Sequence, residues 1–397
     1  MVLKTWLAAG MLGSAGLGVL VWWVGPWSAP FRYEHMDLVS LRQRLDSSPK
    51  DALGWRTLGL RLAREGDASM AVPALLQAYT LNPSDSVVAT GLGEIYTSAG
   101  RYAEAFQFLK AATAQKPPNA FAYMALGRLY RRKASYLHAS EAFEMVVKLD
   151  PKLSDAWYEM AICYLQMQQA AKATDAIAAA IRLEPMQPEY LALQGSIDVA
   201  VGKLDEGFAI TQRAAKLVPS NLKIQSNYAN MLLTNHRNTE DLQKAEQVIG
   251  ILEQINPQYS LLPYQHGQLE QLRGHWPQAV RYLERAVQTA PEQDEVYYAL
   301  SQAYRRVHRV PEADRMAMLY RRRQNLRRQI DAIRIQLGGQ ADNSMLYARL
   351  AELQIQTGDT PSAISSLKAA LKIAPDQTAL KIRLAQLERQ SAPRNSP

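Results

Sequence analysis

The chain has 397 residues, 48% of them hydrophobic and 21% charged, which excludes a disordered chain and, with its many alanines and leucines, favours an all-helical fold. Its single cysteine, Cys163, excludes an intramolecular disulfide framework and a cysteine-based structural zinc site. Most of the net charge of +8 lies between Arg305 and Arg334, where ten arginines face only three acidic residues.

The N-terminal stretch Trp6–Val24 (residues 6–24) is an uncharged run of 19 residues. As a helix it would be about 28 Å long, close to the ~30 Å hydrocarbon core of a bilayer. Trp22 and Trp23 at its end are typical of the boundary between lipid and water. We therefore predict a transmembrane anchor within residues 1–30.

The residues after this run bear on whether it is cleaved. The sequence Trp27–Pro30 is a poor signal-peptidase site, and the run is longer than a usual signal core. We therefore expect an uncleaved anchor, with a cleaved secretory signal as the alternative. Gly10, Ser14 and Gly18 have the spacing of small residues that lets two such helices pack closely, so a homodimer through the anchor is a further option.

The charges around the run bear on its orientation. Arg32, Arg42 and Arg44 come after it, and the positive-inside rule would hold the body of the chain in the cytoplasm. The very short N-terminal tail with Lys4 is instead typical of a signal-anchor that exports the body of the chain. We expect the extracytoplasmic (periplasmic) side, with the cytoplasmic face as the alternative.

Prolines recur through the chain with a fixed period. The first six are separated by 34 residues each, and after one slip of four residues the series resumes and returns near the C-terminus. These prolines are Pro49, Pro83, Pro117, Pro151, Pro185, Pro219, Pro257, Pro291 and Pro375. Because proline makes up only about 5% of an average sequence, the spacing indicates an internal repeat.

Other positions of the 34-residue unit recur as well. With proline as position 32, an aromatic residue recurs at position 4, Leu-Gly at 7 and 8, tyrosine at 11 and alanine at 20 and 27. In unit 120–153 the first four are Tyr123, Leu126, Gly127 and Tyr130. The pattern resembles the tetratricopeptide repeat (TPR), and with the predicted anchor the chain is similar to membrane-anchored bacterial TPR proteins. The resemblance implies a right-handed α-solenoid of helical hairpins.

The physical chemistry of these positions agrees with the resemblance. Positions 4, 7, 8 and 11 share one face of a first helix, and positions 20, 24 and 27 share one face of a second helix. A small residue at 8 and an alanine at 20 leave room for the two helices to cross closely. Proline cannot continue a helix, so it marks the turn into the next unit. Because one hairpin cannot bury this surface alone, stacked hairpins are expected.

The repeat pattern sets the expected domain organisation. Residues 31–51 form a linker and half-repeat, TPR units 1–8 span 52–327, unit 9 spans 344–377, and a capping helix and tail occupy 378–397. The sixth unit carries four extra residues near Thr234–Asp241, which we place in the turn between its two helices.

Unit 8 has Asn325 where the proline should be, so one helix is expected from Pro311 to Leu337, stopped by Gly338-Gly339, within an arginine-rich segment 311–343. Two interpretations of its arginines stay open. They form either the solvated face of a helix that joins two blocks of repeats, or a ridge that binds an acidic protein, anionic lipid or other polyanion. The candidate ridge residues are Arg321, Arg322, Arg323, Arg327 and Arg328. Few aromatic residues accompany them, which argues against nucleic acid.

The resemblance also implies a binding surface. In TPR proteins, positions 2, 5, 9 and 12 of the first helix line the inner, concave side of the solenoid. A mixed aromatic, amide and arginine lining here would suit an extended peptide or a partner helix. Each of these residues is alternatively an ordinary solvated helix position. The candidates are Phe121, Met124, Arg128, Arg131, Tyr158, Asn230, Tyr264, Tyr298 and Arg305.

No catalytic or cofactor motif accompanies the repeats. The six histidines lack metal-binding spacing, and the chain has no G-x-S-x-G, no phosphate-binding glycine loop and no C-x-x-C-H. We expect no enzyme activity, no cofactor, no metal and no nucleic-acid partner, and we place Cys163 in the packed core. We predict a membrane-anchored adaptor for protein–protein interaction in assembly of an envelope or membrane complex, of which cytochrome c maturation is one case. The alternative is a permanent structural subunit of a membrane complex, docked through the arginine-rich helix.

Overall fold

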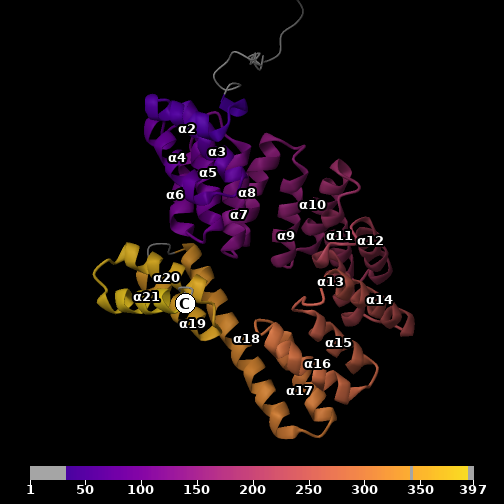
Figure 1. Cartoon of the computed structure of the whole chain (residues 1–397). Helices are drawn as coiled ribbons and strands as arrows, with labels where there is room; N and C mark the ends of the chain where they lie inside the picture. Colours follow the sequence, from indigo (N-terminus) through magenta and orange to yellow (C-terminus); the bar gives the residue numbers. More distant parts are fainter. Residues whose placement is uncertain (1–32, 340–342, 392–397) are drawn as a thin grey trace, which may run out of the picture. The chain divides into compact units, whose positions relative to one another are not determined.

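The computed structural model describes residues 33–339 and 343–391, so the predicted anchor at residues 6–24 lies outside the described residues. Within these ranges the structure is helical and contains no strand, and the helices are labelled α2 to α21 in chain order (Figure 1). No helix in the described ranges combines the length and the apolar character needed to span a bilayer. The prediction of an all-α fold is confirmed. The described residues divide into two compact units, the first ending at Asn82 and the second beginning at Pro83.

The first unit contains α2 (Leu38–Ser47), α3 (Ala52–Arg64) and α4 (Ala68–Leu81). Leu41 and Leu45 of α2 are fully buried in a cluster with Leu58 of α3 and Ala74 of α4. Helix α3 begins where Asp51 accepts a hydrogen bond from the backbone N–H of Gly54, with a distance of 2.9 Å. This cap satisfies a backbone donor that the helix start would otherwise leave unpaired.

The second unit is a series of helical hairpins that ends in one further helix. Successive helices pair as hairpins, and each hairpin contacts the next. The helices are α5 (Ser86–Ser98), α6 (Tyr102–Thr113), α7 (Ala120–Arg132), α8 (Tyr136–Leu149), α9 (Ser154–Gln166), α10 (Ala170–Leu183), α11 (Pro188–Ala200), α12 (Leu204–Leu217), α13 (Leu222–Thr234), α14 (Thr239–Ile255), α15 (Leu262–Leu272), α16 (Trp276–Thr289), α17 (Asp294–Arg306), α18 (Val310–Gly339), α19 (Ser344–Thr357), α20 (Thr360–Ile373) and α21 (Thr378–Ser391). The buried Leu387 of α21 joins a core cluster with α19 and α20, as a capping helix requires.

The two helices of a hairpin cross where the repeat has its small residues. A Cβ added to Gly93 would lie 2.4 Å from the Leu109 side chain, and one added to Gly127 would lie 2.5 Å from the Phe143 ring. The alanines at repeat position 20, such as Ala105 and Ala139, are fully buried. The predicted close crossing at positions 8 and 20 is therefore confirmed.

The turn inside the hairpins has a common backbone conformation. Outside the sixth unit, the residue at repeat position 15 adopts a positive φ, which favours glycine because a Cβ is strained there. The residues are Gly66, Gly100, Ala134, Gln168, Gly202, Gly274, His308 and Gly358. The same repeat position therefore has the same backbone conformation before and after the four-residue insertion.

The four extra residues of the sixth unit are distributed differently from the prediction. The turn between α13 and α14 takes residues 235–238, whereas α14 has 17 residues and the equivalent α12 has 14. Most of the insertion therefore lengthens α14, and the prediction that it lies in the turn was wrong. The physical reason is a strong helix start: Asn238 caps the backbone N–H of Asp241 at 2.9 Å, and Asp241 accepts from the backbone N–H of Arg237 at 3.0 Å.

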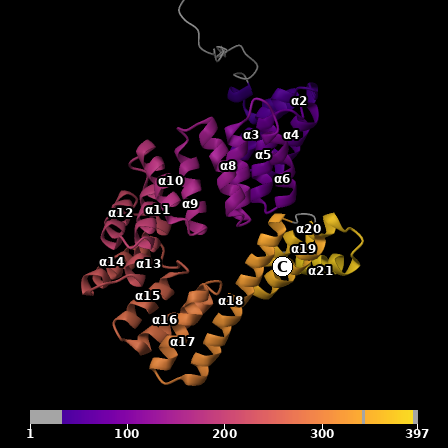
Figure 2. The same ribbon diagram turned by 180° about the vertical axis from the view of Figure 1, so that it is seen from behind.

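Helix α18 is a single helix of 30 residues, or about 45 Å, which confirms the predicted continuous helix. Its first half packs against α16 and α17 through Ala313 and Met316. Its second half packs Leu326, Ile330 and Ile333 against α19. Figures 1 and 2 both show it running on from α17 to the last three helices. The one helix thus serves two separate hydrophobic clusters.

Candidate partner-binding surfaces

The first helices of the hairpins in the second unit lie beside one another in sequence order, from α5 through α7, α9, α11, α13 and α15 to α17. We call the surface formed by repeat positions 2, 5, 9 and 12 of these helices the A-helix face. It contains all nine residues that the sequence analysis proposed for partner binding. The helix contacts place these positions on neighbouring helices along the unit.

Aromatic residues on the A-helix face differ in exposure. Phe121 is 67% exposed and Tyr298 is 51% exposed, with the Tyr298 ring 5.3 Å from that of Tyr320. Met124, in contrast, is only 6% exposed, because it packs in the core cluster that α7 forms with α9. The proposal of Met124 as a contact residue is corrected accordingly: its side chain supports the fold. Phe121 and Tyr298 offer a partner the larger apolar contact.

Arg128 and Arg131 of α7 bind a buried carboxylate on α9. Glu159, 6% exposed, lies 2.7 Å from Nε of Arg131 and 3.4 Å from Nε of Arg128. Neither atom of the 2.7 Å contact makes a hydrogen bond, so it is an ion pair alone. Arg128 also lies 3.8 Å from Asp155. Both guanidinium groups remain partly exposed, so they keep donors for a partner while two acids balance their charge.

Burial near these arginines raises the pKa values of two neighbouring side chains. Burial raises the pKa of Glu94 on α5, although the charge of Arg128 opposes the shift. Burial, followed by the charges of Glu159 and other acids, also raises the pKa of Tyr158. The Tyr158 ring stacks on Tyr190 at 5.0 Å between centroids. This part of the face is therefore polar but close to charge balance, which suits a polypeptide with few net charges.

An amide cluster connects α13 and α15. Gln265, fully buried, donates to the side chain of Asn230 at 2.9 Å and to Ser226 at 3.0 Å. Asn230 therefore acts first as a partner of Gln265. Gln265 was not predicted as a site residue from the sequence, because repeat position 6 is outside the lining positions. Burial also raises the pKa of the neighbouring Tyr264 to about 12, with a further contribution from the charge of Glu295.

The proposed arginine ridge on α18 separates into two groups. Arg323 and Arg327 turn back to α17, where both pair with Asp294, a carboxylate with 0% exposure; the Arg327 distance is 2.8 Å. Both also donate to the backbone carbonyl of Glu292, at 3.2 and 3.1 Å. These two arginines therefore fasten α18 to α17. The remaining ridge residues, Arg321, Arg322 and Arg328, are exposed, and no described residue forms an ion pair with them.

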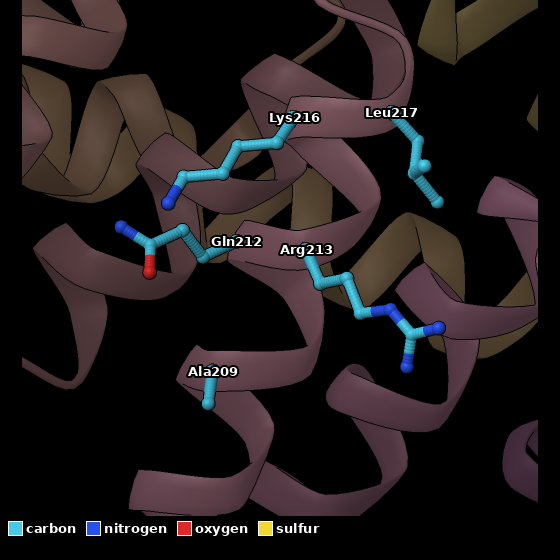
Figure 3. A pocket seen from close by; sticks show the side chains of 5 residues that line it. All are labelled: Ala209, Gln212, Arg213, Lys216 and Leu217. Atoms are coloured by element: carbon cyan, nitrogen blue, oxygen red, sulfur yellow. The ribbon is translucent and has the colours of Figure 1, made fainter.

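A depression of about 340 Å³ lies on the second helix of another hairpin. All five of its lining residues belong to α12 (Figure 3). They are Ala209, Gln212, Arg213, Lys216 and Leu217. Arg213 already donates to the sulfur of Met186 at 3.0 Å. Because no second element among the described residues lines it, the depression lacks the enclosure of a small-molecule site.

The described residues hold no group of three or more histidine, cysteine, aspartate or glutamate side chains able to bind a metal ion. Cys163 is fully buried, as expected, and burial raises the pKa of its thiol to about 12, with the charge of Glu159 adding to the shift. Very little of the reactive thiolate form is therefore present at neutral pH.

Arg305, the last of the partner-binding candidates, is exposed and pairs with Asp314 at 3.2 Å.

Comparison of the sequence with known families identifies three matching segments. The family described as the TPR domain of cytochrome c-type biogenesis protein H matches residues 34–155. Two tetratricopeptide repeat families match residues 135–197 and 346–377. No curated protein matches the chain.

Comparison with solved structures gives helical repeat proteins. A tetratricopeptide repeat protein from Parabacteroides merdae has a TM-score of 0.52 at 14% identity, covering 67% of this chain and 99% of that one. YrrB, described as a TPR protein with an unusual peptide-binding site, has a TM-score of 0.40 at 15% identity, covering 47% and 97%. MamA from Desulfovibrio magneticus has a TM-score of 0.39 at 20% identity, covering 43% and 96%. At 14% identity, the similarity to the Parabacteroides merdae protein shows a shared fold and nothing about function.

Proposed function

The chain belongs to the tetratricopeptide repeat family, and from this we propose that it is a scaffold that holds a segment of a partner polypeptide on its A-helix face. The observation that carries the proposal is the pair of exposed aromatic side chains on that face. Phe121 and Tyr298 leave more than half of their surface in water although they lie on helices that contact their neighbours. Large aromatic side chains of this kind are the usual anchors of protein interfaces.

The surroundings of these aromatics suit a polypeptide. Arg128 and Arg131 are held in place by Glu159, so their free N–H groups are oriented in advance for carbonyl or carboxylate oxygens of a partner. The nearby acids keep the net charge low, which disfavours a polyanion at this part of the face. An extended or helical segment that offers both apolar side chains and backbone carbonyls fits best.

We further propose that the partner is a cytochrome c precursor and that the scaffold is tethered to a membrane by residues 6–24. Two observations support this: the match of residues 34–155 to a TPR domain of a cytochrome c-type biogenesis protein, and the uncharged N-terminal run. The extended surface of a solenoid is suited to holding an extended chain. With a partner other than a cytochrome c precursor, the same architecture would serve the assembly of another envelope complex.

Binding to the A-helix face can be tested with the full-length chain in mild detergent and haem-free apocytochrome c as the probe. The variant Phe121→Ser/Tyr298→Ser should weaken binding by about tenfold or more, since buried aromatic anchors carry much of such energies. Leu137→Ser is a matched control, because Leu137 is 58% exposed but lies on α8, a second helix of its hairpin. It should change the affinity by less than about twofold.

The outcomes separate the two parts of the proposal. Equal affinity for all three proteins would remove the A-helix face as the binding site. Absence of any apocytochrome c binding would remove the cytochrome c precursor as partner.

Membrane attachment needs its own experiment. The full-length chain should stay with the membrane fraction after carbonate washing, and a deletion of residues 6–24 should release it. An alkaline phosphatase fusion at the C-terminus would be active if the body of the chain is exported and inactive if it stays in the cytoplasm.

A further inference from the structure

The solvent side of α18 carries six exposed residues on one line. They succeed one another at intervals of three and four residues, so in a helix with 3.6 residues per turn they form a single stripe. The stripe consists of Met318, Arg321, Asn325, Arg328, Ala332 and Ile335. Its two ends are apolar and largely exposed, Met318 at 69% and Ile335 at 78%. From end to end it covers about 26 Å of helix.

The rotation of α18 about its own axis is fixed by groups away from the stripe. Asp294 of α17 pairs with Arg323 and Arg327, and Leu326 and Ile330 are buried in the cluster with α19. These contacts occupy the sides of the helix that face its neighbours. The stripe is therefore left facing solvent by the fold itself, and its two arginines have no ion-pair partner among the described residues.

Alternation of three and four residues is the spacing of a coiled-coil seam. Such a seam buries its residues against a second helix, and a single asparagine within it sets the register of the pair. Here Asn325 lies between Arg321 and Arg328, which are seven residues, or about 10.5 Å, apart. A facing helix with carboxylates at the same interval would meet both guanidinium groups.

Two other occupants are disfavoured by the same residues. A second copy of this chain would place Arg321 and Arg328 against themselves or each other, in either direction of pairing, and like charges at a seam are repulsive. A membrane surface would require a continuous apolar face, but Met318 and Ile335 lie at opposite ends with both arginines between them.

We propose that this stripe docks an α-helix of a partner protein that carries acidic residues seven apart, opposite Arg321 and Arg328, and apolar residues opposite Met318 and Ile335. The docking site is separate from the A-helix face. It gives the scaffold a second contact through which it is itself positioned within an assembly, while the A-helix face stays open for its polypeptide partner.

The test uses the full-length chain in mild detergent and a synthetic helical peptide of about 20 residues, long enough for the stripe. The peptide has two glutamates seven apart and leucines near both ends. Binding is measured by fluorescence anisotropy at low salt. Arg321→Glu/Arg328→Glu should weaken binding by about tenfold or more, as expected for loss of paired charges at an interface. A peptide with lysines in place of the glutamates should bind this double variant and not the natural chain.

The matched control is Arg315→Glu/Arg322→Glu. These two arginines are exposed, also lie on α18 and are also seven apart, but they are about a quarter of a turn away from the stripe. The control makes the same change in net charge and should alter affinity by less than about threefold at the ionic strength used. Circular dichroism of both double variants checks that the helix content is kept.

Four results would overturn the proposal. The first is equal weakening by the two double variants, which would indicate a general field of positive charge. The second and third are no binding of the glutamate peptide to the natural chain, and failure of the lysine peptide to bind Arg321→Glu/Arg328→Glu. The fourth is binding of anionic lipid vesicles or single-stranded DNA that is lost only in Arg321→Glu/Arg328→Glu.

Discussion

At the scale of single residues, the surroundings of Cys163 decide its chemistry. The thiol is fully buried in α9, and burial together with the negative charge of Glu159 raises its pKa from 9.0 to about 12. The reactive form of cysteine is the thiolate. At pH 8 the folded protein therefore holds almost no reactive thiol, whereas the unfolded chain ionises near the ordinary value.

This difference predicts slow labelling of Cys163 by Ellman's reagent at pH 8 in the native protein and rapid labelling in denaturant. The sign for stability comes from the same shift. Because the folded pKa is the higher one, the stabilising contribution is complete below pH 9 and is lost as the pH rises towards 12. Native labelling as fast as that of a free thiol would show that the residue is accessible. Cys163→Ala should abolish labelling and remove this part of the pH dependence.

The arginines of α18 show where residue-level prediction from sequence stops. All five candidates lie within eight consecutive positions and have the same charge. What separates Arg323 and Arg327 from Arg321 and Arg328 is the buried Asp294, about 30 residues earlier in the sequence. Its carboxylate faces α18 only once α17 and α18 have paired, so helical spacing alone gives no sign of it. Met124 was misassigned for a related reason, since its burial depends on the next hairpin.

At the scale of the helix, the size of the residue at repeat position 8 determines how closely the two helices of a hairpin can pack. In Gly127 a Cβ would come within 2.5 Å of the Phe143 ring, which is fully buried and has no room to retreat. In Gly250, within α14, a Cβ would meet nothing within 4 Å. The two glycines occupy the same kind of secondary structure and differ in their surroundings.

We therefore predict opposite effects of the same substitution. Gly127→Ala should lower the free energy of unfolding by about 1–3 kcal/mol through overpacking. Gly250→Ala should raise it by up to about 1 kcal/mol, because alanine favours helix over glycine. Urea unfolding followed by circular dichroism measures both. Destabilisation of similar size in the two variants would mean that the Phe143 contact is not the cause.

The helices themselves were largely predictable. The proline series and the small residues at positions 8 and 20 are local features that each unit repeats, and the continuous α18 is explained by one missing proline at Asn325. The placement of the insertion in the sixth unit was not predictable from the period. The extra residues could have formed a longer turn, but the cap at Asn238 favours an early start of α14, so most of them are helical.

At the scale of the whole molecule, α18 is the element on which the C-terminal hairpin of α19 and α20 depends. Its two halves belong to different hydrophobic clusters, one with α16 and α17 and the other with α19. In repeat proteins, stability comes from each unit and from contacts with its neighbours. A break in α18 between the clusters should therefore uncouple the residues on either side.

Asn325→Pro places such a break between Met316 and Leu326, because proline in a helix interior costs about 3 kcal/mol and removes a backbone hydrogen bond. We expect residues 343–391 to unfold at a lower temperature than the preceding hairpins, giving two transitions and earlier proteolysis of the C-terminal part. Asn325→Ala is the control and should keep the natural profile. A single transition in the proline variant, with uniform loss of protection in hydrogen exchange, would contradict the uncoupling.

The length of α18 also sets the orientation of the helices that follow it. One residue inserted after Asn325 would turn the rest of α18 and the helices beyond it by about 100° about the helix axis and advance them by about 1.5 Å. Seven residues would restore the angular phase to within about 20°. An insertion in the turn at 235–238 carries no such penalty, because a turn can absorb it locally. The hairpin of α19 and α20 can therefore keep its orientation about the α18 axis only if α18 changes length by close to whole helical turns.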